Sequence, residues 1–273
     1  MNLLWAIVLL VAANVVTIGA MLFVRRRAPD GSFFEDGDRA SGVFGVLATG
    51  FAIFAGFVIV LAFTQYDESR SGAESEALAV AQQFETAQFL PTRADLSGEL
   101  VCYARSVVHD EWPRMEAGSI GNTINPWGVA MFRTLERTDA KTSAEQSAYD
   151  RWHDQTSTRE EARQDRLHGA AGIIPDSIWL VLFLTAGVVF AYMLFFADSG
   201  ERARSQAMLM GSATTIVVVT LLAIVALDNP YRPGVGSLQP IAMERTLELL
   251  DEARAAIGDE TSPPCDGDGA ARE

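Results

Sequence analysis

Charged residues are absent from four long stretches of this 273-residue sequence, although they make up 21% of the whole chain. The uncharged stretches are Asn2–Val24, Gly42–Tyr66, Ser177–Ala197 and Ser205–Leu227. Each exceeds the roughly 18 apolar residues that mark a membrane-spanning helix, since about 20 residues cross a hydrocarbon core about 30 Å thick. These stretches exclude an ordinary soluble enzyme and predict four transmembrane helices.

Cysteine and histidine are scarce as well, with two and three copies. Cys102 and Cys265 are too few for a disulfide scaffold; they could pair only if both face an oxidising compartment, and the tail around Cys265 argues against pairing. None of His109, His153 and His168 has a second histidine four residues away, as a helical zinc site requires. No nucleophile elbow or phosphate-binding loop occurs. We therefore expect no metal, no cofactor and no enzymatic activity.

Basic residues are also outnumbered, 21 against 35 acidic residues, for a net charge of −14. This excludes nucleic-acid binding through bulk charge. The short segments Arg25–Ser41 and Asp198–Arg204 together hold six arginines, against four near the spans on the opposite face. By the positive-inside rule, the termini and the long middle segment then lie outside the cytoplasm. Because Arg25 follows the first apolar run and nothing basic precedes that run, we expect an uncleaved helix and not a signal peptide.

No stretch alternates as a half-buried strand does, so the sequence predicts an all-α integral membrane protein with four transmembrane helices and a helical extramembrane region between helices 2 and 3. The predicted parts are a first helix pair (1–66), an extramembrane segment (67–176), a second helix pair (177–227), a loop with an amphipathic helix (228–257) and a disordered tail (258–273). The second span is expected to continue into the extramembrane segment, because no Gly or Pro interrupts Thr64 to Arg70.

Three pairs of residues mark helix starts in the extramembrane segment: Thr92 with Asp95, Asn125 with Pro126, and Thr142 with Glu145. In the first span, Asn14 lies at mid-membrane depth. An unpaired amide there costs several kcal/mol, so we expect it to hydrogen-bond across a helix interface. No span contains Asp, Glu, Lys, Arg or His, which disfavours a proton- or ion-coupled carrier.

The second span has the most unusual pattern. Gly45, Thr49, Ala52 and Gly56 recur at i, i+4, i+7 and i+11, forming a face of small residues. Phenylalanines fill much of the remainder, among them Phe51, Phe54 and Phe57. One interpretation is a close-packed pore or subunit interface with a hydrophobic gate. The other is ordinary packing on one side, with phenylalanines facing lipid on the other.

Residues at the exits of the second and fourth spans resemble a known family. The run Gly56-Phe57, Tyr66-Asp67, Arg70 and Glu74 resembles the bestrophin pattern, and Asp228-Asn229-Pro230-Tyr231 resembles the bestrophin Asn-Pro-Phe segment. The fuller similarity is to the bestrophin-like family of bacterial membrane proteins, over most of the chain. The resemblance implies a homo-oligomer in the inner (plasma) membrane, and bestrophins are pentameric, calcium-gated anion channels whose second helix lines the neck.

Two departures limit what the resemblance implies. The acidic cluster that follows Asn-Pro-Phe in bestrophins is absent, since Tyr231 is followed by Arg-Pro-Gly-Val-Gly, so calcium gating is not carried over. The bestrophin topology also places the middle segment in the cytoplasm, opposite to the charge distribution, and the orientation stays open. We expect an oligomeric ion channel of unknown ion species; the alternative is a non-conducting scaffold or sensor that binds a partner through the middle segment.

Overall fold

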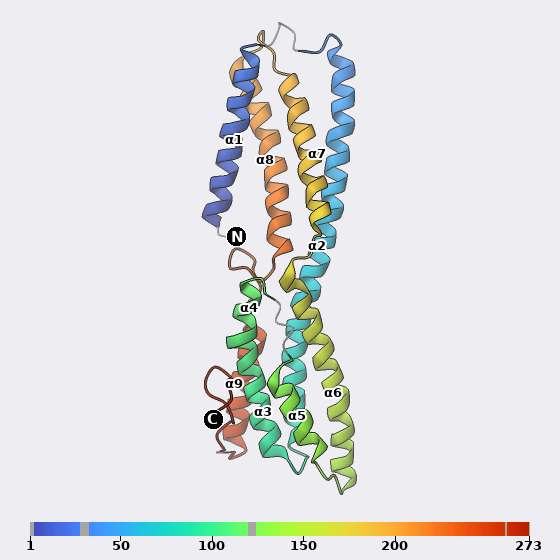
Figure 1. The fold of residues 1–273 in the computed structure, drawn as a ribbon, viewed down its shortest axis with the longest axis vertical. Coiled ribbons are helices and arrows are strands. Elements are labelled where there is room, and N and C mark those ends of the chain that lie inside the picture. Colours follow the sequence, from blue (N-terminus) through green and yellow to red (C-terminus); the bar gives the residue numbers. More distant parts are fainter. Residues whose placement is uncertain (1–2, 28–32, 120–123, 260, 273) are drawn as a thin grey trace. The chain divides into compact units, whose positions relative to one another are not determined.

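A computed structural model describes residues 3–27, 33–119, 124–259 and 261–272, and these residues form helices with no strand beyond one isolated bridge. The α-helices are α1 (Leu3–Arg25), α2 (Gly37–Ala87), α3 (Arg93–Ser106), α4 (Trp112–Glu116), α5 (Pro126–Glu136), α6 (Ser143–His168), α7 (Asp176–Phe195), α8 (Ala203–Asp228) and α9 (Ile241–Ala256) (Figure 1). A π-helical turn, Val107–Glu111, joins α3 to α4, and a 3₁₀ turn, Gly169–Ala171, follows α6. The all-α prediction is confirmed.

Among the described residues, four helices are long and apolar enough to cross a membrane, α1, α2, α7 and α8, and each contains an 18-residue stretch whose mean hydropathy is at least 2.3. Their positions agree with the four uncharged stretches. Helix α2 is a single helix of 51 residues that runs on well past its apolar part, as the absence of Gly and Pro from Thr64 to Arg70 predicts.

The chain divides into two compact units. The membrane unit comprises residues 1–64, 172–228 and 233–236, and the extramembrane unit comprises 65–171, 229–232 and 237–273. In the membrane unit, α1 packs against α8 and α7. The Asn14 side-chain amide donates to Thr215 Oγ1 of α8 at 3.2 Å and to the carbonyl of Leu10 at 3.0 Å. The predicted hydrogen bond across a helix interface is therefore present.

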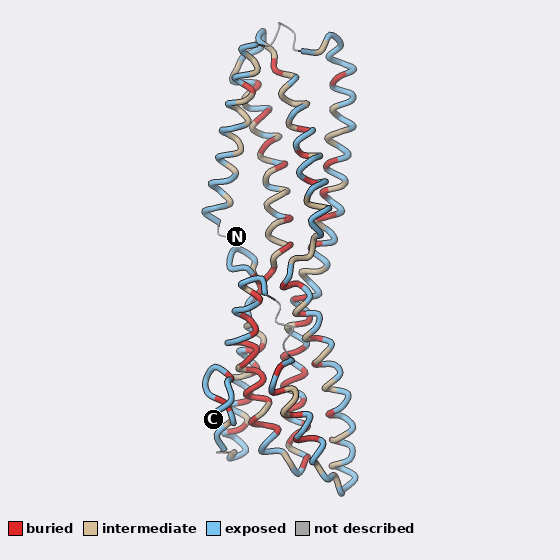
Figure 2. Tube along the Cα trace, viewed as in Figure 1, coloured by how far each residue is buried: buried red, intermediate tan, exposed pale blue. Residues whose placement is uncertain are grey.

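The extramembrane unit is built around α3, whose residues are mostly buried (Figure 2). Two of the predicted helix starts are confirmed: Asn125 accepts from the Trp127 amide at 3.0 Å, and Thr142 with Glu145 forms a complete capping box. The third helix also begins where predicted, at Arg93 directly after Thr92, but the Thr92 side chain makes no cap and bonds Thr138 Oγ1 at 2.7 Å instead. The threonine hydroxyl has a side-chain partner available, which replaces the local bond to the helix end.

The C-terminal residues differ from the expected disordered tail. Thr261–Arg272, here called the C-terminal strap, is a folded loop, and Cys265 in it is joined to Cys102 of α3 by a disulfide. The Trp127 indole donates to the carbonyl of Gly269 at 2.7 Å. Gly269 has φ +84°, and a Cβ there would lie 2.5 Å from the backbone nitrogen of Ser106. A polar segment with no core of its own is thus ordered by a covalent link and close backbone contact.

Candidate functional site

The small-residue face of α2 has no packing partner among the described residues of the chain. Gly45, Thr49, Ala52 and Gly56 are all exposed. A Cβ built on Gly45 or on Gly56 would meet no atom within 4 Å. Small residues at helix interfaces serve to let another helix approach closely. Since none of the described helices of the membrane unit covers this face, the face is open to contact with lipid, another copy or a pore.

The three phenylalanines singled out in the sequence separate in the structure. Phe51 is buried and Phe54 half-buried, and both join an apolar cluster with Ala55 and Val58. The other members of this cluster lie on α7 and α8 and include Leu182, Ala186, Val189, Val217 and Ile224. Phe57 instead remains 67% exposed. Phe51 and Phe54 therefore fix α2 against its own protomer, and Phe57 alone of the three is available on the outer side.

Beyond the apolar part of α2, three residues of the bestrophin-like motif continue the helical spacing of the small-residue face. Asp67, Arg70 and Glu74 follow Gly56 at steps of 11, 14 and 18 residues, which continues the register of three and four residues along one helix face. All three are exposed, and Arg70 and Glu74 form a 3.1 Å ion pair. Tyr66 is half-buried against the extramembrane core.

The motif after the fourth span has a positioning role that the contacts make plain. Asp228, the last residue of α8, accepts hydrogen bonds from the amides of Ile173 and Ile174 at 2.8 and 2.7 Å, and from the Trp179 indole at 3.3 Å. Its carboxylate thus holds the start of α7 against the end of α8 within the membrane unit.

Asn229 and Pro230 form the turn that follows. The Asn229 carbonyl accepts from the Arg232 amide at 3.2 Å, and the Pro230 carbonyl from the Leu238 amide at 2.8 Å. Tyr231, next in the motif, was not among the predicted site residues, yet it is fully buried and donates to the Arg166 carbonyl at 2.6 Å. Its position directly after Asn229 and Pro230 was the feature of the sequence that could have marked Tyr231 as a site residue.

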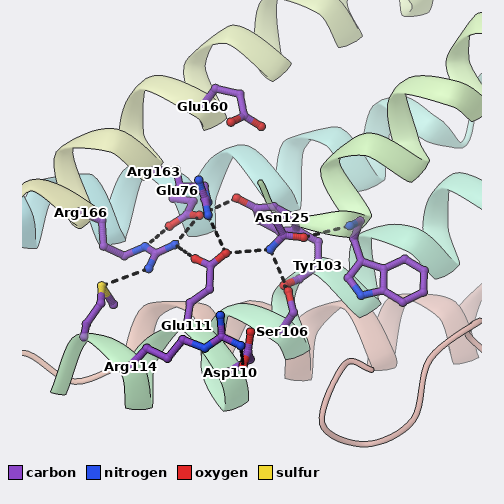
Figure 3. Close-up of polar contacts among 12 residues, drawn as sticks. Glu76, Tyr103, Ser106, Asp110, Glu111, Arg114, Asn125, Glu160, Arg163 and Arg166 are labelled. Carbon is purple, nitrogen blue, oxygen red and sulfur yellow. Dashed lines mark hydrogen bonds and ion pairs between the residues drawn. The ribbon is translucent and has the colours of Figure 1, made fainter. Parts of the chain in front are cut away.

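A buried network of charged and polar side chains, which sequence reasoning missed, lies at the centre of the extramembrane unit (Figure 3). The guanidinium of Arg166 on α6 donates two hydrogen bonds to the carboxylate of Glu76 on α2, from Nε and from Nη2. Arg166 Nη2 also donates to Glu111 Oε2 at 2.6 Å. Arg163 Nη2 donates to Glu111 Oε1 at 2.8 Å. Tyr103 donates to Glu76 Oε1 at 2.6 Å. Two carboxylates thus face two guanidinium groups, and the network joins α2, α3 and α6.

Asn125 extends the network to the start of α5. Its side-chain nitrogen donates to Glu111 Oε1 at 2.9 Å and to Ser106 Oγ at 2.8 Å, while its oxygen caps α5 (Figure 3). Because Asn125 satisfies both a buried carboxylate and a helix end, the start of α5 is tied to the same ion pairs.

The π-helical turn Val107–Glu111 carries Glu111 into this network. The sequence predicts that the helix ends near Trp112 and Pro113, but it continues through the wider turn to Glu116. A proline inside an α-helix lacks an amide donor and its ring collides with the carbonyl four residues earlier, whereas a π turn widens the backbone at that point. The wider turn accommodates Pro113.

The pKa values of the network follow from burial and pairing. Burial opposes ionisation of Glu111, but Arg166 and Arg163 outweigh it and lower the Glu111 pKa. Burial likewise opposes the charge on Arg166, yet Glu76 and Glu111 raise the Arg166 pKa. Burial raises the pKa of the Tyr103 hydroxyl. The network is therefore held in one charge state, with Tyr103 as a neutral donor, and it acts as a structural clamp.

Acidification should weaken this clamp. Since the folded-state pKa of Glu111 lies below its ordinary value of 4.5, its contribution to the free energy of unfolding is full above pH 4.5 and is lost as the pH falls through the folded pKa. We expect amides of α6 to exchange faster below about pH 4.5 when hydrogen exchange is measured in detergent, after correction for the intrinsic rate. Glu111→Gln should flatten this dependence, and an unchanged profile in that variant would contradict it.

Within the described ranges, no group of three or more His, Cys, Asp or Glu side chains is placed to hold a metal ion. The carboxylates that converge, Glu76 and Glu111, are already bound by arginines. The geometry thus describes a four-span helical membrane protein with an ion-paired helical extramembrane unit and an unpartnered face on its second membrane helix.

Comparison with known proteins identifies the family. The family model described as the Bestrophin-like domain matches residues 7–242, and the chain belongs to this family. Tyr66, Asp67, Arg70, Glu74 and the Asp228 motif all lie inside the matched region, whereas the C-terminal strap lies outside it. No curated protein matches the sequence.

Solved structures show the same fold. A bacterial bestrophin homologue from Klebsiella pneumoniae, solved by Zn-SAD phasing, has a TM-score of 0.67 at 15% identity and covers 95% of this chain and 100% of its own. A substituted form of a K. pneumoniae homologue has a TM-score of 0.65 at 15% identity, over 91% and 98% of the two chains. The crystal structure of a further membrane protein, in a substituted form, has a TM-score of 0.65 at 12% identity, over 94% of this chain and 98% of its own.

Proposed function

We propose that the chain assembles as a homo-oligomer in the inner membrane, with the small-residue face of α2 turned toward neighbouring copies around a central path that conducts ions. The observation that carries the proposal is the exposed, unpartnered face formed by Gly45, Thr49, Ala52 and Gly56. A helix face of small residues gains little from contact with lipid tails, whereas a second helix can approach it closely.

The charge pattern along α2 supports a conducting path. The face is uncharged where it lies in the membrane and ends in Asp67, Arg70 and Glu74, all exposed. In a ring of copies these residues would form charged rings at the exit, and rings of charged side chains select ions by their sign. The exposed Phe57 supplies an apolar group of the kind that gates by dewetting. Membership of the bestrophin-like family supports the same reading and argues against an enzyme.

Planar-bilayer recording of the purified oligomer tests the proposal. We expect single-channel conductance from the wild type, and loss of oligomer and of conductance in Gly56→Leu, because four added carbons prevent close helix approach. The matched control is Gly19→Leu on α1, where a Cβ also meets nothing within 4 Å and which should retain both. An intact oligomer that carries no current in chloride or sodium salts would overturn the channel and favour the non-conducting scaffold. A wild-type monomer would overturn the assembly.

A further inference from the structure

The two cysteines of the chain are brought together across 163 residues of sequence. Cys102 lies on α3 and Cys265 in the C-terminal strap; they form a disulfide with a Cα–Cα distance of 5.7 Å, and both side chains are fully buried. The sequence contains no other cysteine. Structural disulfides are typical of oxidising compartments and rare in the cytosol, where thiol reductants keep cysteines reduced.

Charge gives an independent indication of the compartment. With four spans, segments 26–36 and 196–202 share one membrane face, and the extramembrane unit belongs to the other. Arginines concentrate in the two short segments and their helix ends: Arg25, Arg26, Arg27, Arg39, Arg202 and Arg204. Short loops rich in arginine remain in the cytoplasm. This assigns the extramembrane unit to the opposite side, which is the side where a disulfide persists.

We infer that the extramembrane unit lies on the oxidising, extracytoplasmic face of the membrane, and that the Cys102–Cys265 disulfide is a covalent latch that holds the C-terminal strap on α3 and α5. In the closing step each thiol gives up a proton, one sulfur–sulfur bond forms, and two electrons pass to a disulfide of a thiol oxidant, which becomes a dithiol. The orientation is opposite to the one that the bestrophin resemblance implies.

Contacts around the latch show what it holds in place. The strap folds on itself, since Asp266 Oδ1 accepts from the amides of Asp268 and Ala270 at 3.0 and 2.9 Å. It meets the rest of the unit through the Trp127 indole, through Arg105 Nη1, which donates to the Asp266 carbonyl at 3.0 Å, and at its first residue through Arg254 of α9, which donates to the Thr261 carbonyl. These few polar contacts are weak compared with a covalent bond, so reduction should release the strap from Trp127.

Thiol trapping in growing cells tests the latch. Cells are quenched with acid, free thiols are blocked with N-ethylmaleimide, and the denatured protein is then reduced and labelled with a maleimide-polyethylene glycol. We expect both cysteines to be labelled only after reduction, as a double mass shift. If both cysteines are blocked before reduction, the inference is overturned. This measurement uses the unmodified full chain and does not require a cysteine-free variant to fold.

Sidedness is tested without the cysteines, by fusing reporters to the C-terminus of the full chain. Alkaline phosphatase should be active and green fluorescent protein dark, and the reverse result would overturn the orientation. For the strap, Cys102→Ser with Cys265→Ser should raise hydrogen exchange of peptides from 261–272 on the order of a hundredfold. The matched control Trp127→Phe, which removes one hydrogen bond and keeps the disulfide, should raise it only a few-fold. Equal exchange in the cysteine-free variant and the wild type would contradict the latch.

Discussion

Replacing Arg166 by methionine should unfold much of the extramembrane unit. Arg166 and Glu76 are fully buried, and Glu111 is 8% exposed. Without the guanidinium, Glu76 keeps Tyr103 as its donor but has no opposite charge, and Glu111 keeps Arg163 as its one opposite charge and Asn125 as a neutral donor. Removing one partner of a buried ion pair costs about 3–5 kcal/mol, because the other charge stays buried and uncompensated. The local free energy of unfolding, measured by hydrogen exchange of α6 amides in detergent, should fall by that amount.

Two further variants separate pairing from general damage to the helix. Arg70→Met removes the exposed Arg70–Glu74 pair, which solvent screens, and should leave the local free energy of unfolding nearly unchanged. The double variant Glu76→Leu with Arg166→Met replaces both buried charges and should be less destabilised than Arg166→Met alone. A double variant as unstable as the single one, or a single variant within about 1 kcal/mol of the wild type, would show that the network is not the clamp described above.

The sequence predicts the membrane helices well because their signal is local. An uncharged run of the right length specifies a span without reference to any other part of the chain. The same holds for Asn125 before Pro126 and for Thr142 with Glu145, where the cap and the group it binds are two or three residues apart. Thr92 shows the limit of predicting caps from neighbouring residues. Its hydroxyl was expected to cap the start of α3, but it hydrogen-bonds Thr138, which is 46 residues away in the sequence.

The clamp and the latch are long-range features, and for that reason the sequence pattern does not reveal them. Glu76 and Arg166 are 90 residues apart in the sequence. Arg166 also belongs to a helix that is predominantly polar, so nothing in the local pattern indicates that its side chain is buried. One signal was available: Arg159, Arg163 and Arg166 lie at i, i+4 and i+7, on one face of α6, and two of the three are buried. Composition also predicted disorder around Cys265, because Gly, Pro and Asp cannot form a core, and a covalent bond overrides that argument.

The second large effect is expected at Gly72, where α2 and α6 touch. A Cβ at this position would lie 2.7 Å from the backbone nitrogen of Arg166 and 2.8 Å from the carbonyl oxygen of Ala162. Backbone atoms cannot turn aside as a flexible side chain can, so Gly72→Ala must move the two helices apart. Glu76 lies one turn further along α2, and the same movement would lengthen its two hydrogen bonds with Arg166.

We therefore expect Gly72→Ala to cost about 2–3 kcal/mol and to lower the midpoint of thermal unfolding of the full chain in detergent by about 5–10 °C. Gly50→Ala on the same helix, outside the small-residue face, is the matched control. Its Cβ meets no atom of the protomer, so the same one-carbon change should leave the midpoint unchanged or slightly raised. If the two variants unfold at the same temperature, then close contact between α2 and α6 does not set the stability of the extramembrane unit. A loss confined to Gly72→Ala, in contrast, shows that glycine is required there because the α2 and α6 backbones are in contact.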